Sequence, residues 1–164
     1  ITLSSINDKS KHWLKELKKY AIEINASTAK SCNVNKSSAI TCVKPSGTVS
    51  QLTNSASGIH PRHNNYYIRT VRQDNKDPLT VFMKDKGFIH EPAIGKEDST
   101  TIFSFAMKSP DGAVMRDKKT AIEQLEHWLM FQESWCEHKP SITVYVREHE
   151  WLQVGAWVYD HLKL

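Results

Sequence analysis

The sequence of 164 residues lacks any long uninterrupted hydrophobic run. Hydrophobic residues make up 39% of it and are interspersed with charged residues, which make up 24%, whereas a membrane-spanning helix needs about 20 consecutive apolar residues. The first ten residues also lack the basic start, apolar stretch and small-residue cleavage site of a secretory signal. The sequence therefore excludes a membrane-spanning protein, and we expect a cytoplasmic location.

Cysteine is scarce, and the three cysteines at positions 32, 42 and 136 include no C-x-x-C pair. An odd count without such a pair argues against a disulfide scaffold and against a zinc module. We expect Cys42 and Cys136 in the core and Cys32 in an exposed turn. His60 and His63 have no third metal ligand nearby in the sequence, so no metal site is predicted, and His60 is expected to shape its loop.

No charge of one sign dominates, since 22 Lys and Arg against 18 Asp and Glu leave a net charge of +4. The main lysine run, between residues 9 and 19, has neither interleaved aromatic residues nor the pattern of a recognition helix. We therefore expect these lysines to form the solvated face of a helix, with no direct contact to nucleic acid.

The hydrophobic periodicity predicts alternating helices and strands. Helices are expected at about residues 10–24, 78–86, 120–137 and 148–162, and strands at about 39–43, 101–107 and 141–146. This alternation indicates an α/β fold with a largely parallel sheet and flanking helices. Three strands are few for such a sheet, because both of its edges would expose unpaired backbone groups. The chain also starts without Met and stops within a predicted helix, so we expect part of a larger domain.

A loop is expected from residue 44 to 76, far longer than the usual connection of about 4 to 6 residues, and loops of this length are usually functional. It opens with Lys44-Pro-Ser-Gly-Thr-Val-Ser50, after a predicted strand, where ligands of α/β sheets bind. The hydroxyls of Ser46, Thr48 and Ser50, with a glycine that exposes backbone N–H groups, are features of a phosphate cradle. Neither dinucleotide nor Walker spacing is present, and a plain turn is the alternative.

Several spaced motifs together resemble the adenosylcobalamin-dependent, class II ribonucleotide reductases. The resemblance runs from about residue 10 to the end of the chain. It is carried by the segments 44–50 (KPSGTVS), 57–61 (SGIHP), 67–72 (YIRTVR), 77–79 (DPL), 140–146 (PSITVYV) and 148–151 (EHEW). It implies that residues 1–164 are a partial catalytic barrel domain, the later part of a ten-stranded α/β barrel.

The resemblance implies an oxidoreductase that converts ribonucleotides to deoxyribonucleotides by thiyl radical chemistry initiated by adenosylcobalamin. In such an enzyme this piece would bind the substrate phosphates, through Ser46, Gly47, Thr48, Val49 and Ser50. The implied partners are the ribonucleotide substrate, the rest of the reductase chain, and a thioredoxin-like or glutaredoxin-like reductant. Diphosphate and triphosphate substrates are both compatible with these motifs.

The sequence departs from the family at the catalytic cysteines. The family's radical cysteine lies in an Asn-x-Cys-x-Glu context, which does not occur here, and the C-terminal redox cysteine pair is missing. We therefore expect no catalytic residue in this chain and no reductase activity from the chain alone. The alternative is a stand-alone nucleotide- or anion-binding module without radical chemistry.

Overall fold

The computed structural model describes residues 8–163, with the side chain of Asp8 excepted. It contains two compact units, Ile1–Arg62 together with Pro110–Leu164, and His63–Ser109. Each is described here by itself. The expected absence of a secretory signal concerns the chain's first residues, of which 1–7 lie outside the described part. Among the described residues, no helix combines the length and apolar character needed to cross a membrane.

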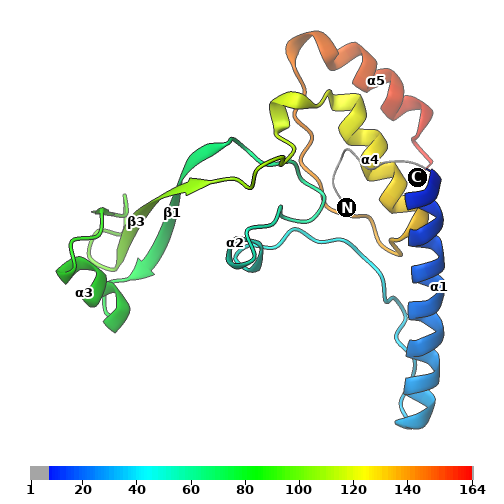
Figure 1. Ribbon diagram of the computed structural model, residues 1–164, viewed down its shortest axis with the longest axis horizontal. Coiled ribbons are helices and arrows are strands. Elements are labelled where there is room, and N and C mark those ends of the chain that lie inside the picture. Colours follow the sequence, from blue (N-terminus) through cyan, green and yellow to red (C-terminus); the bar gives the residue numbers. More distant parts are fainter. Residues whose placement is uncertain (1–7, 164) are drawn as a thin grey trace. The chain divides into compact units, whose positions relative to one another are not determined.

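The first unit is mainly helical. Its elements are α1 (Asp8–Ser31), α2 (Val49–Leu52), the short 3-10 helix η2 (Arg116–Lys118), α4 (Ala121–Ser134), the 3-10 helix η3 (Glu148–Glu150) and α5 (Trp151–Asp160). Helix α1 lies beside α4 (Figure 1). The core between them contains Leu14, Ile59, Met130, Phe131 and Cys136. A buried core residue from the 44–62 stretch, Ile59, therefore anchors that stretch to the helices.

Local signals explain where α4 begins. The Thr120 Oγ1 accepts a hydrogen bond from the Glu123 N–H at 3.1 Å, and the Thr120 N–H donates to Glu123 Oε2 at 2.8 Å. This reciprocal pair is a capping box, which satisfies two N–H groups that a helix end would leave unpaired. The buried Glu150 also accepts from the Ala121 N–H at 3.0 Å. The start of α4 is thus held by both local and distant partners.

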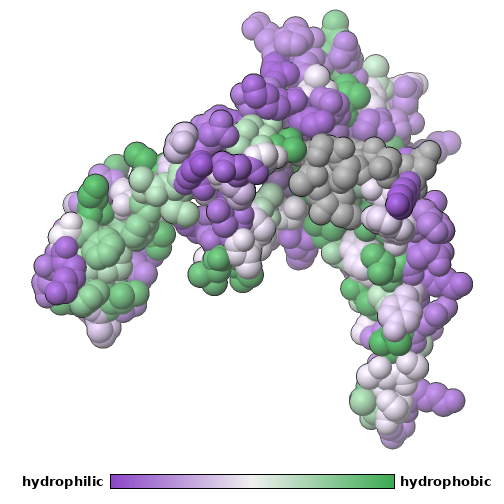
Figure 2. Space-filling model, viewed as in Figure 1, coloured by the Kyte–Doolittle hydropathy of each residue, from purple (hydrophilic) through white to green (hydrophobic). Residues whose placement is uncertain are grey.

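The second unit is a three-stranded antiparallel sheet with one helix. Its elements are β1 (Tyr66–Asp74), α3 (Pro78–Asp85), β2 (His90–Pro92) and β3 (Thr100–Lys108), and the strand order is β1-β3-β2. Phe103, on the central strand, is fully buried. Asp77 caps α3 by accepting from the Leu79 N–H at 2.8 Å. Figure 2 shows hydrophobic residues on the surface of this unit; those most exposed are Tyr66, Ile68, Ile89 and Ile94.

Two of the three predicted strands are wrong for the described chain. Residues 39–43 and 141–146 belong to no sheet among residues 8–163. The backbone of a strand forms hydrogen bonds with a neighbouring strand, whereas here it forms them with side chains. The Ile40 and Thr41 N–H groups donate to the Glu137 carboxylate. The Gln124 side-chain amide bonds to both the N–H and the carbonyl of Tyr145. Half-buried and exposed residues still alternate along 141–146, the pattern from which a strand was predicted.

The pairing of the observed strands differs from the expected parallel topology. The strand predicted at 101–107 is present as β3, but it pairs antiparallel with β1 and β2, so the sheet is not parallel and the barrel is not confirmed. The loop expected over 44–76 contains α2 and all of β1. Polar residues lie on both faces of β1, and its exposure alternates only between half-buried and exposed. Because the two faces of β1 differ so little in hydrophobicity, hydrophobic periodicity does not predict this strand.

The helices agree better with the prediction, although their ends differ. The helix expected at 10–24 is longer. Its apolar residues Trp13, Leu17, Tyr20 and Ile24 are each about half exposed. Leu14 and Ala29 are the buried apolar side chains of α1 instead. The expected helices 78–86 and 120–137 correspond to α3 and α4, and 148–162 corresponds to η3 followed by α5.

Candidate functional site

The loop predicted to bind phosphate is held by two of its own serines. The Ser46 Oγ accepts a hydrogen bond from the Ser50 N–H at 2.9 Å, and the Ser57 Oγ donates to the Ser46 carbonyl at 2.9 Å. Ser50 is only 4% exposed, and its Oγ donates to the Ser46 carbonyl. Ser46 and Ser50 therefore stabilise the turn, and their hydroxyls are less available to a ligand than the sequence suggested.

Gly47, Thr48 and Val49 form the exposed part of this loop. The Thr48 side chain makes no capping hydrogen bond to α2. Within residues 8–163, no hydrogen bond from the backbone N–H groups of Thr48 and Val49 is present. Two backbone donors and one hydroxyl are thus free to bind an anion, which is the chemistry expected of a phosphate cradle.

Of the glycines in the motifs 44–50 and 57–61, Gly58 has a left-handed backbone conformation. Its φ is +59°, and a Cβ at this position would lie 3.2 Å from the Lys44 carbonyl oxygen and 3.3 Å from the Pro45 nitrogen. A Cβ on Gly47, in contrast, would meet nothing within 4 Å, and its φ is not positive. The two motifs at 44–50 and 57–61 therefore touch through their backbones, and only Gly58 is required for that contact.

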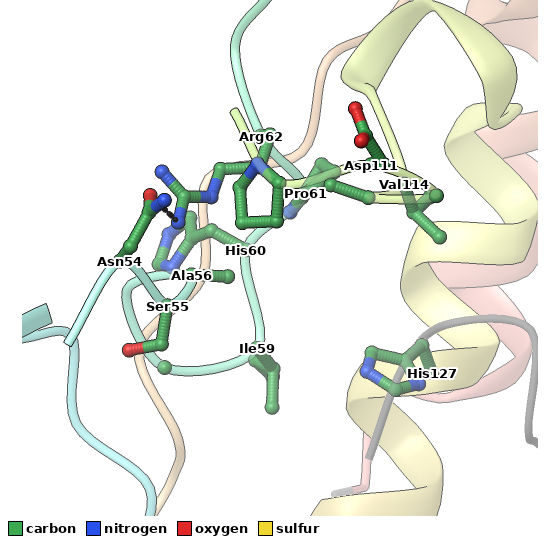
Figure 3. A pocket seen from close by; sticks show the side chains of 14 residues that line it. Asn54, Ser55, Ala56, Ile59, His60, Pro61, Arg62, Asp111, Val114 and His127 are labelled. Atoms are coloured by element: carbon green, nitrogen blue, oxygen red, sulfur yellow. Dashed lines mark hydrogen bonds between the residues drawn. The ribbon is translucent and has the colours of Figure 1, made fainter. Parts of the chain in front are cut away.

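A cavity of about 400 Å³ lies beside the 57–61 motif. It is lined by residues 54–56, 58–62 and 110–114 and by His127 from α4. Arg62 is 8% exposed, and its guanidinium donates to Asn54 Oδ1 at 3.1 Å. Figure 3 shows this pair on one side of the cavity and His127 on the opposite side. No local pattern in the sequence indicates this arrangement, because its parts come from distant segments.

His127 is a buried imidazole in the middle of α4. It is 1% exposed, its Nδ1 has no hydrogen-bond partner among the described residues, and it contacts the ring of Phe131 edge-on. Desolvation lowers the pKa of His127 to about 4, so the ring is neutral at pH 7. His127 shares the buried face of α4 with the polar residues Gln124 and Ser134, so hydrophobic periodicity does not mark this face in the sequence.

The cysteines do not form a catalytic group. Cys32 is exposed, Cys42 is half-buried and not in a strand, and Cys136 is buried. The prediction of a core position is thus right for Cys136 and only partly right for Cys42. Burial raises the pKa of the Cys136 thiol. In the part of the chain that is described, no three His, Cys, Asp or Glu side chains come together as a metal site would require.

The chain has relatives of similar sequence among curated proteins. No family model matches it. It is 30% identical over 146 residues to the adenosylcobalamin-dependent ribonucleoside-triphosphate reductase of Lactobacillus delbrueckii subsp. bulgaricus, covering 86% of this chain and 20% of that protein. For the enzyme of the same name from Euglena gracilis, the identity is 27% over 134 residues, covering 82% and 18%. The chain thus spans about a fifth of the length of these curated relatives.

A solved structure gives the same result. The crystal structure of a B12-dependent (class II) ribonucleotide reductase aligns with 93% of this chain and 22% of its own chain, with a TM-score of 0.75 and 26% sequence identity. The resemblance predicted from the spaced motifs is therefore confirmed by sequence and by structure.

Proposed function

Because the chain is similar to class II ribonucleotide reductases over most of its length, we propose that it is part of an enzyme that reduces ribonucleotides to deoxyribonucleotides with adenosylcobalamin. Its own contribution is to bind the phosphates of the ribonucleotide at residues 46–50. The rest of the reductase and a thioredoxin-like or glutaredoxin-like reductant would complete the reaction, in the cytoplasm.

The observation that carries this assignment is the exposed apex of the loop. The backbone N–H groups of Thr48 and Val49 and the Thr48 hydroxyl are free, and Gly47 places no side chain in front of them. Ser46 and Ser50 hold the apex in shape through the hydrogen bond between them. Hydrogen bonds to charged oxygens are stronger than those to neutral groups, so several such donors suit a phosphate.

The described residues do not fit a role in cobalamin chemistry. A thiyl radical needs a cysteine that faces the substrate, whereas Cys136 is buried and Cys42 directs its thiol to the Val43 carbonyl, 3.6 Å away. Cys32 is exposed, but it directly follows α1 and does not line the cavity at residues 54–62. We therefore assign cofactor binding and radical formation to the remainder of the enzyme, and the isolated chain is expected to be inactive.

The proposal is tested in the full-length enzyme with Thr48→Ala and Gly47→Val. Loss of one hydrogen bond to a charged oxygen is worth about 1.5 kcal/mol or more, so Thr48→Ala should weaken nucleotide binding about tenfold. Gly47→Val should weaken it further, by covering the backbone donors. Thr53→Ala is the matched control, because the Thr53 hydroxyl already donates within the chain to the Val49 carbonyl. If both loop variants fold, by circular dichroism, and bind nucleotide like the parent, the loop is only a turn.

A further inference from the structure

Residues 40–42 lie against the residues that follow α4. The Glu137 N–H donates to the Thr41 carbonyl at 2.9 Å, and the Trp135 Nε1 donates to the Cys42 carbonyl at 3.3 Å. The Thr41 Oγ1 also donates to the Trp135 carbonyl, and the Cys42 Sγ lies 4.0 Å from the His138 carbonyl oxygen. Cys42 therefore contacts the segment that contains Cys136.

The two thiols are close to one another. The Cys42 Sγ lies 3.6 Å from the Val43 carbonyl oxygen and 4.0 Å from the His138 carbonyl oxygen. The pKa of Cys136 is raised mainly by burial, and the neighbouring Cys42 thiol raises it further. A disulfide joins Cβ atoms about 3.5 to 4.5 Å apart, so the bond requires these two contacting segments to hold Cys42 and Cys136 at that spacing.

The two cysteines differ in access. Cys136 is 3% exposed and lies in the core with Leu14 and Met130, whereas Cys42 is half-buried. A small reagent can thus reach the Cys42 sulfur before the Cys136 sulfur, which is buried. Cys32, the third cysteine, is exposed and serves as a reference for an unassisted thiol.

We propose that Cys42 and Cys136 are an oxidisable pair, which a small-molecule disulfide such as oxidised glutathione converts to an intrachain disulfide. The Cys42 thiolate attacks the reagent, forming a mixed disulfide and releasing one thiol. The Cys136 thiolate then attacks the Cys42 sulfur, forming the Cys42–Cys136 bond and releasing the second thiol. Two protein thiols are oxidised, one disulfide is reduced, and the two protons leave on the released thiols.

The bond would fix the segment that leads into the loop at 44–50. Cys42 lies two residues before Lys44, and Cys136 follows the end of α4, so oxidation would tie that loop covalently to the helical core. A cross-link between residues so far apart in the chain restricts the unfolded state strongly. This inference does not depend on the proposed function, because it rests only on the contacts between these two segments.

The test is disulfide mapping of the full-length protein after incubation with oxidised glutathione. Digestion without reductant should yield a linked peptide pair containing Cys42 and Cys136, which dithiothreitol separates. Cys42→Ser should abolish the pair and leave Cys136 unmodified in the folded protein, whereas Cys32→Ser should leave the pair unchanged. Oxidation should also raise the melting temperature of the parent, by about 10 °C, and not that of Cys42→Ser.

Three results would overturn the proposal. The first is a folded protein in which both thiols stay free while Cys32 reacts. The second is a stable glutathione adduct on Cys42 that Cys136 does not displace. The third is a linked pair that forms only in denaturant, where the native pairing of residues 40–43 with 135–138 is absent.

Discussion

The imidazole of His60 accepts a hydrogen bond from the backbone N–H of Thr143, with 2.9 Å between Nε2 and the nitrogen, although the two residues are 83 positions apart. Its Nδ1 lies 2.8 Å from the Ser57 carbonyl oxygen. Because the Thr143 N–H can only donate, Nε2 must accept and the proton must be on Nδ1, which donates to Ser57. One imidazole ring thus joins the 57–61 motif to the segment 141–146.

Replacing His60 by Phe should destabilise the protein. The aromatic ring is kept, but both side-chain hydrogen bonds are lost and the Thr143 N–H loses its partner, at a cost of about 1 to 2 kcal/mol. The Ser57 carbonyl still accepts from the backbone N–H of residue 60. The free energy of unfolding in urea measures this effect. His63→Phe is the matched control, because His63 is exposed and its Nδ1 pairs only with the neighbouring Asn64 side chain. Equal stability of the two variants would show that the His60 bridge contributes nothing.

Gly58→Ala should destabilise the loop, and Gly47→Ala should not. At Gly58 the added Cβ would meet the Lys44 carbonyl in a backbone with φ of +59°, whereas at Gly47 it would meet nothing within 4 Å. The strain at Gly58 should lower the free energy of unfolding by about 1 to 3 kcal/mol. Denaturant unfolding of both variants tests this. A Gly58→Ala protein as stable as Gly47→Ala would contradict the close contact between the two motifs.

His127 should make the protein less stable as the pH falls. Its pKa is lowered from 6.5 to about 4 by desolvation, so between these values the unfolded chain binds a proton that the folded chain excludes. The stability due to the neutral ring is complete above pH 6.5 and is lost as the pH falls towards 4. His127→Phe should flatten this part of the stability profile, measured by circular dichroism, whereas His149→Gln, at an exposed position, should not. A parallel loss in His127→Phe would refute the assignment.

Glu137 should also make the protein less stable as the pH falls, but over a lower pH range than His127. Hydrogen bonds from the Ile40 and Thr41 N–H groups lower the pKa of its carboxyl below 4.5. A lowered pKa in the folded state means that the stabilisation is present above pH 4.5 and is lost as the pH falls below it. Glu137→Gln should lose stability at pH 7 and lack this acid step, in denaturation measured from pH 7 to pH 3. Glu133→Gln, an exposed position on α4, is the control and should retain the step.

The local sequence is sufficient to predict the capped helices and to identify the family. Asp77 and Thr120 cap α3 and α4 as their positions in the sequence predict, because a helix satisfies its backbone within the segment and its end needs only a nearby side chain. The spaced motifs likewise identified the relatives, since a specific match depends on residue identity and spacing and not on contacts.

Only the tertiary structure shows which segments pair as strands and which residues line the cavity. Residues 39–43 have an apolar sequence, yet their backbone bonds to Glu137 and not to a strand, because pairing depends on which neighbour is present. Arg62 and His127 line one cavity only because residues 54–62 are packed against α4 through Ile59. Gly58, and not Gly47, is the position that requires glycine, because the Lys44 carbonyl lies close to Gly58. This is a contact between two segments, which no local sequence pattern indicates.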